Sequence, residues 1–397
     1  MKRFNKLIIA ILILIVIGTI CLFQNYFNDN IIQSDSALTF NEYGVLFSPE
    51  EIDSNCKDKY FYNQLNEDEK LYYQAMYYAS INNTCEIEWT FFPDSIILKK
   101  AKRAFIEDWP LYYWWNYASF IYTDEYNFTN DKGENITYYV SYPEKTDKGS
   151  IKRNISKIEE FGETAVKACY DEDPYTYVKN IHDYVIDNTS YNLDAENAQT
   201  LLGAVIDKEC VCEGYAREFQ YLTNKAGFNC VSPEGLAKFP ISADNPNINH
   251  KWNMIEINDV WYQVDCTWDD SYNDGQTHLY LLLNDNTMYI DHELGHITGF
   301  SYPVCDGEIV DVDNTVLIVD SYNTDEISEF INNNLSKNSY TFTLRLINDK
   351  DYDDALSWLV DGNGIYDLYF KHFGYEYPKN SYQYYRRDES NTIVFNL

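Results

Sequence analysis

Basic residues are scarce in this chain of 397 residues. It has 30 Lys and Arg against 63 Asp and Glu, which gives a formal net charge of −33. Nucleic-acid binding needs clustered Lys and Arg to neutralise phosphates, so the composition argues against a nucleic-acid partner. The acidity fits a solvated surface. An attraction for cationic substrates is the alternative interpretation.

Cofactor signatures are also missing from the sequence. It contains no phosphate-binding loop and no dinucleotide fingerprint. The segment Asp270-x-x-x-Asp274-Gly275 departs from the calcium-loop pattern at Tyr272 and lacks the final Glu. We therefore expect no cofactor. Internal repeats and low-complexity tracts are absent too.

Only one apolar run approaches the length that spans a bilayer. It covers residues 7–23, follows Lys2, Arg3 and Lys6, and is near the short end of the spanning range. No good small-x-small cleavage site follows it. Because the positive flank stays in the cytoplasm, residues after about 30 should lie outside. We expect a cell-membrane protein with a single-pass N-terminal anchor and an extracellular bulk, or a secreted protein if the segment is cleaved.

The chain length and a hydrophobic content of 45% predict two or three domains. Helical spacing and capping signals predict helices that start at Ser48-Pro49 and others near 71–78, 96–107, 151–169 and 174–188, with a hairpin within 117–143. After Asp306, strands at 316–319, 340–346 and 392–395 alternate with helices at 325–335 and 352–360. The expected units are a 1–30 anchor or signal segment, a 31–160 mostly helical region, a 161–305 core domain and a 306–397 small α/β module.

Cys212 is the first candidate for chemistry. It begins Cys-Glu-Gly-Tyr-Ala, after which Tyr215, Phe219 and Leu222 follow at helical spacing and Gly227 suits a C-cap. The thiol is therefore expected at a helix N-terminus, where partial positive charge and free N–H groups favour a thiolate and could stabilise an oxyanion. Gly214 beside it would let a substrate backbone approach closely.

His250 and Asp265 lie on either arm of an expected hairpin. Residues 252–257 and 260–265 read as strands around an Asn258-Asp259 turn. In that register His250 and Asp265 become diagonal neighbours on the less apolar face. A Cys at a helix start with a His oriented by an Asp is the arrangement that nucleophilic catalysis needs.

These segments resemble the transglutaminase-like core of bacterial surface proteins. The resemblance rests on Cys-Glu-Gly-Tyr-Ala, His-Lys-Trp-Asn and Trp-Tyr-x-Val-Asp-x-Thr-Trp, in that order, and covers roughly residues 175–305. It implies an α+β, papain-like fold, in which a helix bearing Cys212 packs on an antiparallel sheet bearing His250 and Asp265. It also implies roles of nucleophile, base and acid, and His-orienting residue for these three. In such proteins a small residue is more usual at the position of Cys210. A regulatory disulfide between Cys210 and a neighbouring residue is therefore a further hypothesis.

The resemblance implies acyl transfer or hydrolysis on a protein or peptide substrate. The expected external location favours cell-wall peptides or surface proteins as substrates. Whether the reaction is cross-linking, deamidation or proteolysis stays open. A surface binding or scaffold module with the same fold is the non-enzyme alternative.

A competing motif is His292-Glu293-x-x-His296. It matches a zinc-protease pattern in which two histidines on a helix bind zinc and the Glu acts as general base. Tyr302 stands where the longer form of that pattern needs a third His. A zinc metallopeptidase is therefore an alternative, but the sequence shows no third zinc ligand.

An external location would permit disulfides. Cys56 and Cys85 flank one helical stretch and are candidates to pair. Eight cysteines lie outside the apolar run: Cys56, Cys85, Cys169, Cys210, Cys212, Cys230, Cys266 and Cys305.

Overall fold

The computed structural model describes residues 40–41, 43–116, 120–129, 133–144, 148–238, 247–270, 278–310, 312, 314–374 and 383–397. The expected N-terminal anchor lies outside these ranges. Across the described part of the chain, no helix is both long and apolar enough to cross a bilayer. Helices and strands both contribute throughout, so the fold class is α+β.

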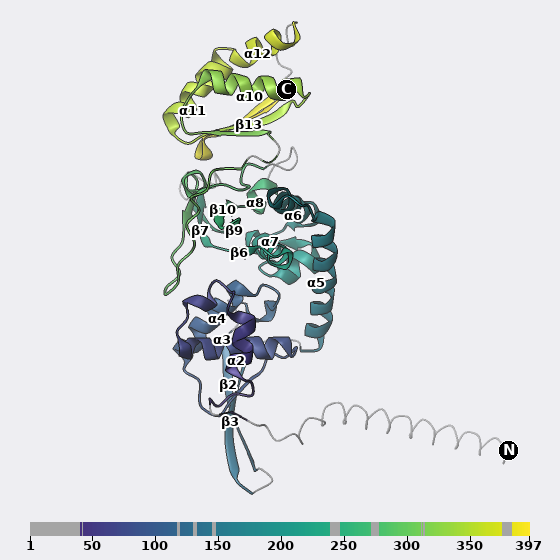
Figure 1. Ribbon diagram of the computed structural model, residues 1–397, viewed down its shortest axis with the longest axis vertical. Helices are drawn as coiled ribbons and strands as arrows, with labels where there is room; N and C mark the ends of the chain where they lie inside the picture. The colour runs from purple at the N-terminus through teal and green to yellow at the C-terminus, as the bar shows by residue number, and fades with distance from the viewer. Residues whose placement is uncertain are drawn as a thin grey trace, which may run out of the picture.

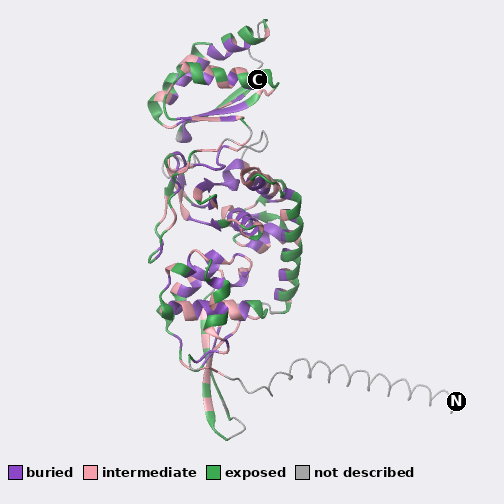
Figure 2. Cartoon of the chain, viewed as in Figure 1, coloured by how far each residue is buried: buried purple, intermediate pink, exposed green. Residues whose placement is uncertain are grey.

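The N-terminal region combines a group of helices with a small antiparallel sheet. Ser48 caps the first helix by accepting the N–H of Glu51, and Asn66 and Glu69 form a capping box on the next. The long hairpin projects away from the helices and is mostly exposed or half-buried (Figures 1 and 2). The elements are α2 (Pro49–Cys56), η1 (Tyr62–Gln64), α3 (Glu67–Ile81), β1 (Ile87–Trp89), α4 (Ser95–Asp108), η2 (Tyr113–Trp115), β2 (Ile121–Thr129) and β3 (Asn135–Pro143), in strand order β1-β3-β2.

The central part packs helices against two three-stranded antiparallel sheets. One sheet has the order β10-β9-β6 and the other β11-β7-β8, and only Trp252 separates β8 from β9. The elements are α5 (Lys148–Cys169), α6 (Pro174–Asn188), β4 (Ser190–Tyr191), η3 (Gly203–Asp207), β5 (Glu209–Cys210), α7 (Cys212–Ala226), β6 (Asn229–Val231), β7 (Glu234–Lys238), β8 (Asn247–Lys251), β9 (Asn253–Ile257), β10 (Val260–Val264), α8 (Cys266–Asp270), α9 (Asp285–Met288) and β11 (His292–Leu294).

The C-terminal module is a four-stranded sheet with helices. Its strand order is β12-β13-β15-β14, with β12 and β13 parallel and the other pairs antiparallel. The expected strands and helices are present, and α12 and β14 were not expected. The elements are β12 (Val316–Val319), α10 (Thr324–Ser336), β13 (Thr341–Leu346), α11 (Asp349–Leu356), η4 (Ser357–Asp361), α12 (Gly364–Phe373), β14 (Gln383–Arg387), η5 (Asp388–Ser390) and β15 (Thr392–Asn396).

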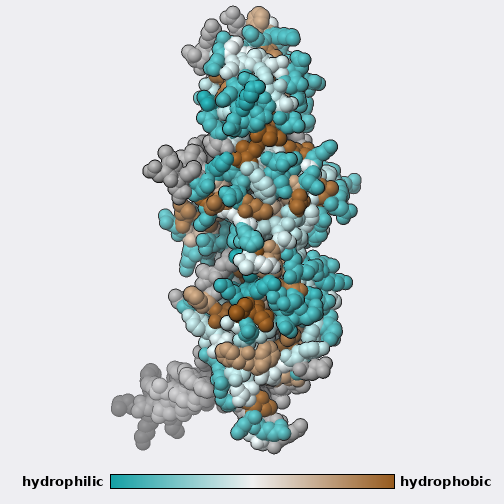
Figure 3. Space-filling model, turned by 90° about the vertical axis from the view of Figure 1, so that its left-hand side faces the viewer, coloured by the Kyte–Doolittle hydropathy of each residue, from teal (hydrophilic) through white to brown (hydrophobic). Residues whose placement is uncertain are grey.

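The three parts are stacked along the long axis of the molecule, and α5 runs beside the junction of the first two (Figure 1). The face shown in Figure 3 is largely hydrophilic, with apolar surface near the junction between the central part and the C-terminal module. The N-terminal region and the central part share one hydrophobic core, because Val231 and Met254 pack with the aromatic residues of the first helices. The central sheet therefore depends on the N-terminal helices for part of its burial.

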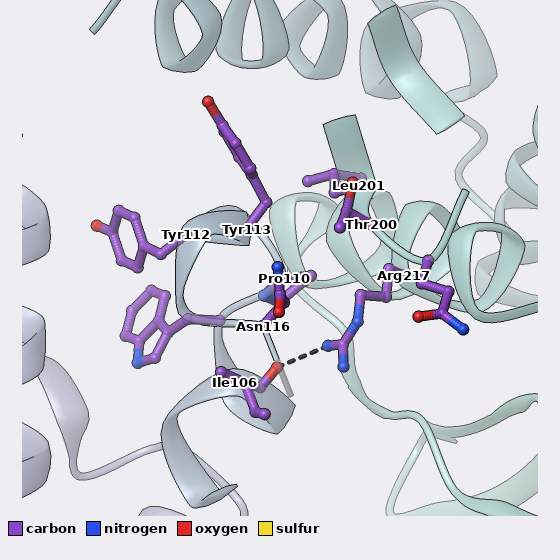
Figure 4. A pocket seen from close by; sticks show the side chains of 10 residues that line it. Ile106, Pro110, Tyr112, Tyr113, Asn116, Thr200, Leu201 and Arg217 are labelled. Atoms are coloured by element: carbon purple, nitrogen blue, oxygen red, sulfur yellow. Dashed lines mark hydrogen bonds between the residues drawn. The ribbon is translucent and has the colours of Figure 1, made fainter. Parts of the chain in front are cut away.

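Polar contacts reinforce that junction at the nucleophile-bearing helix. Arg217 on α7 donates to the carbonyl of Ile106 at 2.6 Å, beside a small pocket between α4 and α7 (Figure 4). Gln220 donates to the carbonyl of Glu107 at 2.6 Å. The Glu107 carboxylate is fully buried and accepts from Lys251 at 3.2 and 3.3 Å. The N-terminal helices thus hold both α7 and the strand that carries His250.

Candidate active site

Cys212 is the first residue of α7. Val211 precedes it in an extended conformation without a side-chain cap, and Gly227 ends the helix with φ 100°. The thiol is partly exposed, whereas the other seven cysteines within the described ranges are buried. The expected position of the thiol at a helix N-terminus is present. The Cys56–Cys85 disulfide and a disulfide of Cys210 are not formed in the structure.

Gly214 has a different role from the one expected. A side chain there would collide with the side chain of Cys210 and approach the carbonyl of Ala198. Gly214 therefore allows α7 to pack closely on the segment that precedes it. The expectation that it opens space for a substrate backbone is wrong, because its missing side chain faces the protein interior.

The β9–β10 hairpin, which lies between the two candidate residues in the sequence, has the expected register. Ile257 pairs with Val260 and Asn253 with Val264, and the turn residues Asn258 and Asp259 have φ of 54° and 64°. Two successive positive φ values fit a type I′ turn, which asparagine and aspartate tolerate. Asp265 thus follows the end of β10.

His250 on β8 and Asp265 are in direct contact. The His250 Nε2 atom lies 2.6 Å from Asp265 Oδ2, and both residues are buried. Asp265 Oδ1 accepts the backbone N–H groups of Thr267 and Trp268 at 3.0 and 3.2 Å. Burial raises the pKa of Asp265, but the charge and hydrogen bonds of the two histidines outweigh it, so the pKa lies well below its usual range.

The thiol completes this group. Burial lowers the pKa of His250, but the Asp265 carboxylate and the Cys212 side chain, which forms a hydrogen bond with the imidazole, raise it to about 10. Because Nε2 faces Asp265, Nδ1 is the nitrogen left for the sulfur. An imidazolium and a helix N-terminus beside a thiol are the surroundings in which cysteine enzymes form thiolates. The structure therefore brings Cys212, His250 and Asp265 together in one group.

Sequence reasoning missed a second histidine in this site. His292 Nε2 lies 3.1 Å from the same Asp265 Oδ2, and His292 Nδ1 lies 2.6 Å from Asp291 Oδ1. Asp291 Oδ2 accepts from Tyr280 at 2.7 Å and from Arg345, on β13 of the C-terminal module, at 3.0 Å. A series of contacting side chains thus runs from the Cys212 thiol through His250, Asp265, His292 and Asp291 to Arg345 of the C-terminal module.

The zinc-protease motif does not adopt its helical geometry. His292 lies on strand β11, and β11 pairs with β7. His296 follows the strand and is exposed, whereas His292 is buried. Residues four apart on an extended chain are separated by roughly 13 Å, too far for both to bind one ion, so the pattern does not converge on one ion here.

Tyr191 flanks the candidate nucleophile. It lies at the end of β4, beside Cys210 of β5, and its side chain is half-exposed. Burial raises the pKa of its hydroxyl, and the charges of Cys212, Cys210 and Asp265 raise it further. A phenol is therefore near the thiol on a partly open side.

The sequence matches the mouse protein named kyphoscoliosis peptidase, with 28% identity over 85 residues. This match covers 20% of the chain and 13% of that relative. The chain resembles transglutaminase-like proteins. No family model matches it.

Two solved structures also show likeness to the chain. One is described as a TGase, with 15% identity, a TM-score of 0.27 and coverage of 48% of this chain and 53% of that chain. The other is the periplasmic domain of TgpA from Pseudomonas aeruginosa, with 16% identity, a TM-score of 0.23 and coverage of 37% and 65%. The chain thus spans about half of the TGase and a small part of the mouse relative.

Proposed function

We propose that this chain is a thiol enzyme that transfers or hydrolyses acyl groups on proteins or peptides, with Cys212 as nucleophile. The observation that carries the proposal is the placement of the partly exposed Cys212 thiol at the start of α7, beside the His250–Asp265 pair. In this proposal the central part is a papain-like core. The resemblance to transglutaminase-like proteins adds support for a thiol enzyme.

The reaction would proceed in two halves. The Cys212 sulfur attacks the carbonyl carbon of a glutamine side chain or a peptide bond, and the carbon–nitrogen bond breaks. His250 gives a proton to the departing ammonia or amine, and a thioester remains on Cys212. A second amine or water then attacks the thioester, passes a proton to His250 and releases the sulfur. An amine acceptor gives cross-linking, and water gives deamidation or cleavage.

Asp265 would act on this reaction through His250. Its carboxylate accepts a hydrogen bond from Nε2 of the ring and so directs Nδ1 towards the sulfur. It also stabilises the imidazolium that gives its proton in the first half-reaction and forms again in the second. His292 would keep Asp265 in place. We assign both Asp265 and His292 positioning roles, because neither touches the reacting atoms.

Tyr191 is our candidate for part of the oxyanion hole. The backbone N–H groups at the start of α7 provide one source of donors, and the half-exposed Tyr191 hydroxyl provides another. Tyr191→Phe should lower kcat by roughly 10- to 100-fold and leave KM nearly unchanged, since an oxyanion donor acts mainly in the transition state. A rise in KM of the same size, with kcat unchanged, would assign Tyr191 to substrate binding.

Mass spectrometry of products tests the proposed function. The chain would be incubated with a glutamine-rich protein and a primary amine, alongside Cys212→Ala. An amine adduct or a cleaved peptide that is absent with the variant would support acyl transfer or proteolysis. Uniform, slow alkylation of all cysteines, with no product in either sample, would instead favour a binding or scaffold module.

We also propose that the protein is held at the cell membrane by residues 1–30, with the rest outside the cell. The support is the apolar run after Lys2, Arg3 and Lys6. Protease added to intact cells should then digest the chain beyond residue 30. Full protection until the cells are lysed would refute this location.

A further inference from the structure

We infer that His182, Asp183 and His278 form a binding site for a divalent transition-metal ion of the zinc class. His182 and Asp183 lie on α6, and His278 precedes Leu279 at the start of a described segment. Asp183 Oδ1 lies 3.0 Å from His182 Nδ1 and 2.8 Å from His278 Nε2. The three possible ligand atoms all lie within 4.8 Å of one another. The site is separate from the Cys212 group and does not depend on the proposed function.

The donor set selects among metal ions. Two imidazole nitrogens and one carboxylate oxygen are ligands that zinc and its neighbours accept, with a fourth position left for water. Calcium and magnesium prefer sets made of oxygen alone. Lys179 lies 2.6 Å from Asp183 Oδ2, so the carboxylate would offer the metal only its Oδ1 atom.

A buried carboxylate orients the first histidine for this role. His182 Nε2 lies 3.1 Å from Asp269 Oδ2, and both side chains are fully buried. Asp269 is itself fixed, because its two oxygens accept the Tyr280 N–H at 3.2 and 3.1 Å. A histidine that donates one ring N–H to a carboxylate and turns the other nitrogen to the metal is the usual arrangement in metal sites.

The ion also has a path from solvent. His278 and Asp183 keep 12% and 21% of their side-chain surface exposed, in contrast to His182. His278 lines a pocket together with Leu281, Ile309 and Val316, where the central part meets the C-terminal module. Binding would replace the protons that the two histidines share with Asp183.

Such an ion would fasten α6 to the elements around Asp265. Asp269 belongs to α8 and donates its N–H to the carbonyl of Asp265 at 3.2 Å. The expected effect is therefore stabilisation of the chain, measurable without any substrate.

Calorimetric titration of the full, chelator-treated chain with zinc chloride tests the site. The Cys212→Ala background removes the catalytic thiol as a competing ligand. We expect one ion per chain, a higher Tm with zinc, and a loss of affinity of about 100-fold or more in His278→Ala. Asp269→Asn should weaken binding by about 10- to 100-fold. The matched control is His296→Ala, an exposed histidine outside the cluster, which should bind zinc as the parent does.

A second measurement keeps the test valid if the His278 variant does not fold. The Cys212-containing chain loaded with Co²⁺ should show d–d absorption bands without a thiolate charge-transfer band. The inference is overturned if the chain binds no zinc beyond the weak level of surface histidines, if His278→Ala binds as the parent does, or if the cobalt spectrum shows a thiolate ligand.

Discussion

His292 and His250 approach the same carboxylate oxygen of Asp265, with Nε2–Oδ2 distances of 3.1 and 2.6 Å. Two backbone N–H groups donate to the other oxygen. Asp265 therefore receives hydrogen bonds from both sides and has no freedom to turn. The candidate base is held by a carboxylate that is itself fixed by strand β11.

Asp265→Asn should weaken the reactivity of Cys212 strongly. The change keeps the size of the side chain but removes the charge that raises the pKa of His250 to about 10. With the raised pKa, the imidazolium is present at neutral pH and is lost only as the pH rises through about 10. In the variant, that loss should move towards about 6.5, the ordinary value. The alkylation rate of Cys212 between pH 5 and 11, followed by peptide mass spectrometry, measures the shift.

A comparable loss of activity would also follow from unfolding, so the thermal melt of Asp265→Asn must be recorded. A folded variant whose pH profile matches the parent would contradict the role of Asp265. For the overall reaction we expect kcat to fall by roughly 10²- to 10⁴-fold, as in other triads that lose the orienting carboxylate.

His292→Gln should lower kcat by about 10-fold and change KM little. The variant removes the imidazole donor to Asp265 Oδ2 and the contact with Asp291, and so loosens the carboxylate behind the base. His296→Gln serves as the control, because His296 belongs to the same motif but is exposed. A merely structural His292 would lower Tm and leave kcat per folded molecule and the pH profile intact.

Arg345 and Asp291 form a fully buried ion pair at 3.0 Å that joins the C-terminal module to the central part. Arg345→Met leaves the Asp291 charge without its cation and should destabilise the chain by about 3–5 kcal/mol. Asp291→Asn combined with Arg345→Met should recover part of this loss. Urea unfolding of the two single variants and the double variant gives the coupling energy. Strictly additive losses would show that the pair contributes nothing as a pair.

Local patterns predicted the elements and the first part of the site. The helix cap at Ser48 and the turn at Asn258-Asp259 each depend on residues within a few positions, so the sequence carries them directly. The register of the hairpin predicted that His250 and Asp265 would lie close together, and they do, although His250 itself lies on β8, which pairs with β7 and not with β10. These features need no knowledge of how distant segments pack.

The rest of the site depends on contacts between distant segments. His292 reaches Asp265 because β11 pairs with β7, and Arg345 reaches Asp291 across 54 positions of sequence. No periodicity in the sequence predicts either contact. The motif His292-Glu293-x-x-His296 pointed to a helix, but strand pairing prevailed over it. For Gly214 the neighbour that excludes a side chain is Cys210, a packing contact that the sequence could not distinguish from an opening for substrate.

Glu218 on α7 makes stability depend on pH. Its carboxyl is fully buried, and burial raises its pKa to about 7, although a hydrogen bond from Thr189 and the charge of Lys208 oppose this. The folded chain therefore keeps a proton that the unfolded chain loses from about pH 4.5 upwards. Stability from this group is fully present below about pH 4.5 and is lost as the pH rises through about 7, for a total of about 3 kcal/mol.

Glu218→Gln should remove this dependence. In the variant, the amide oxygen can still accept from the Thr189 hydroxyl. In the parent, the Glu218 Oε1 atom has no hydrogen-bond partner among the described residues, so no hydrogen bond stabilises a negative charge there, and the amide of the variant forms no such charge. We expect the variant to be more stable than the parent at pH 8 and similar to it at pH 4.5, by urea unfolding at both values. Because all other groups titrate equally in the two proteins, the difference between the curves isolates Glu218. Parallel curves would mean that water or a local rearrangement solvates the carboxylate, and Glu218 would then carry no penalty at neutral pH.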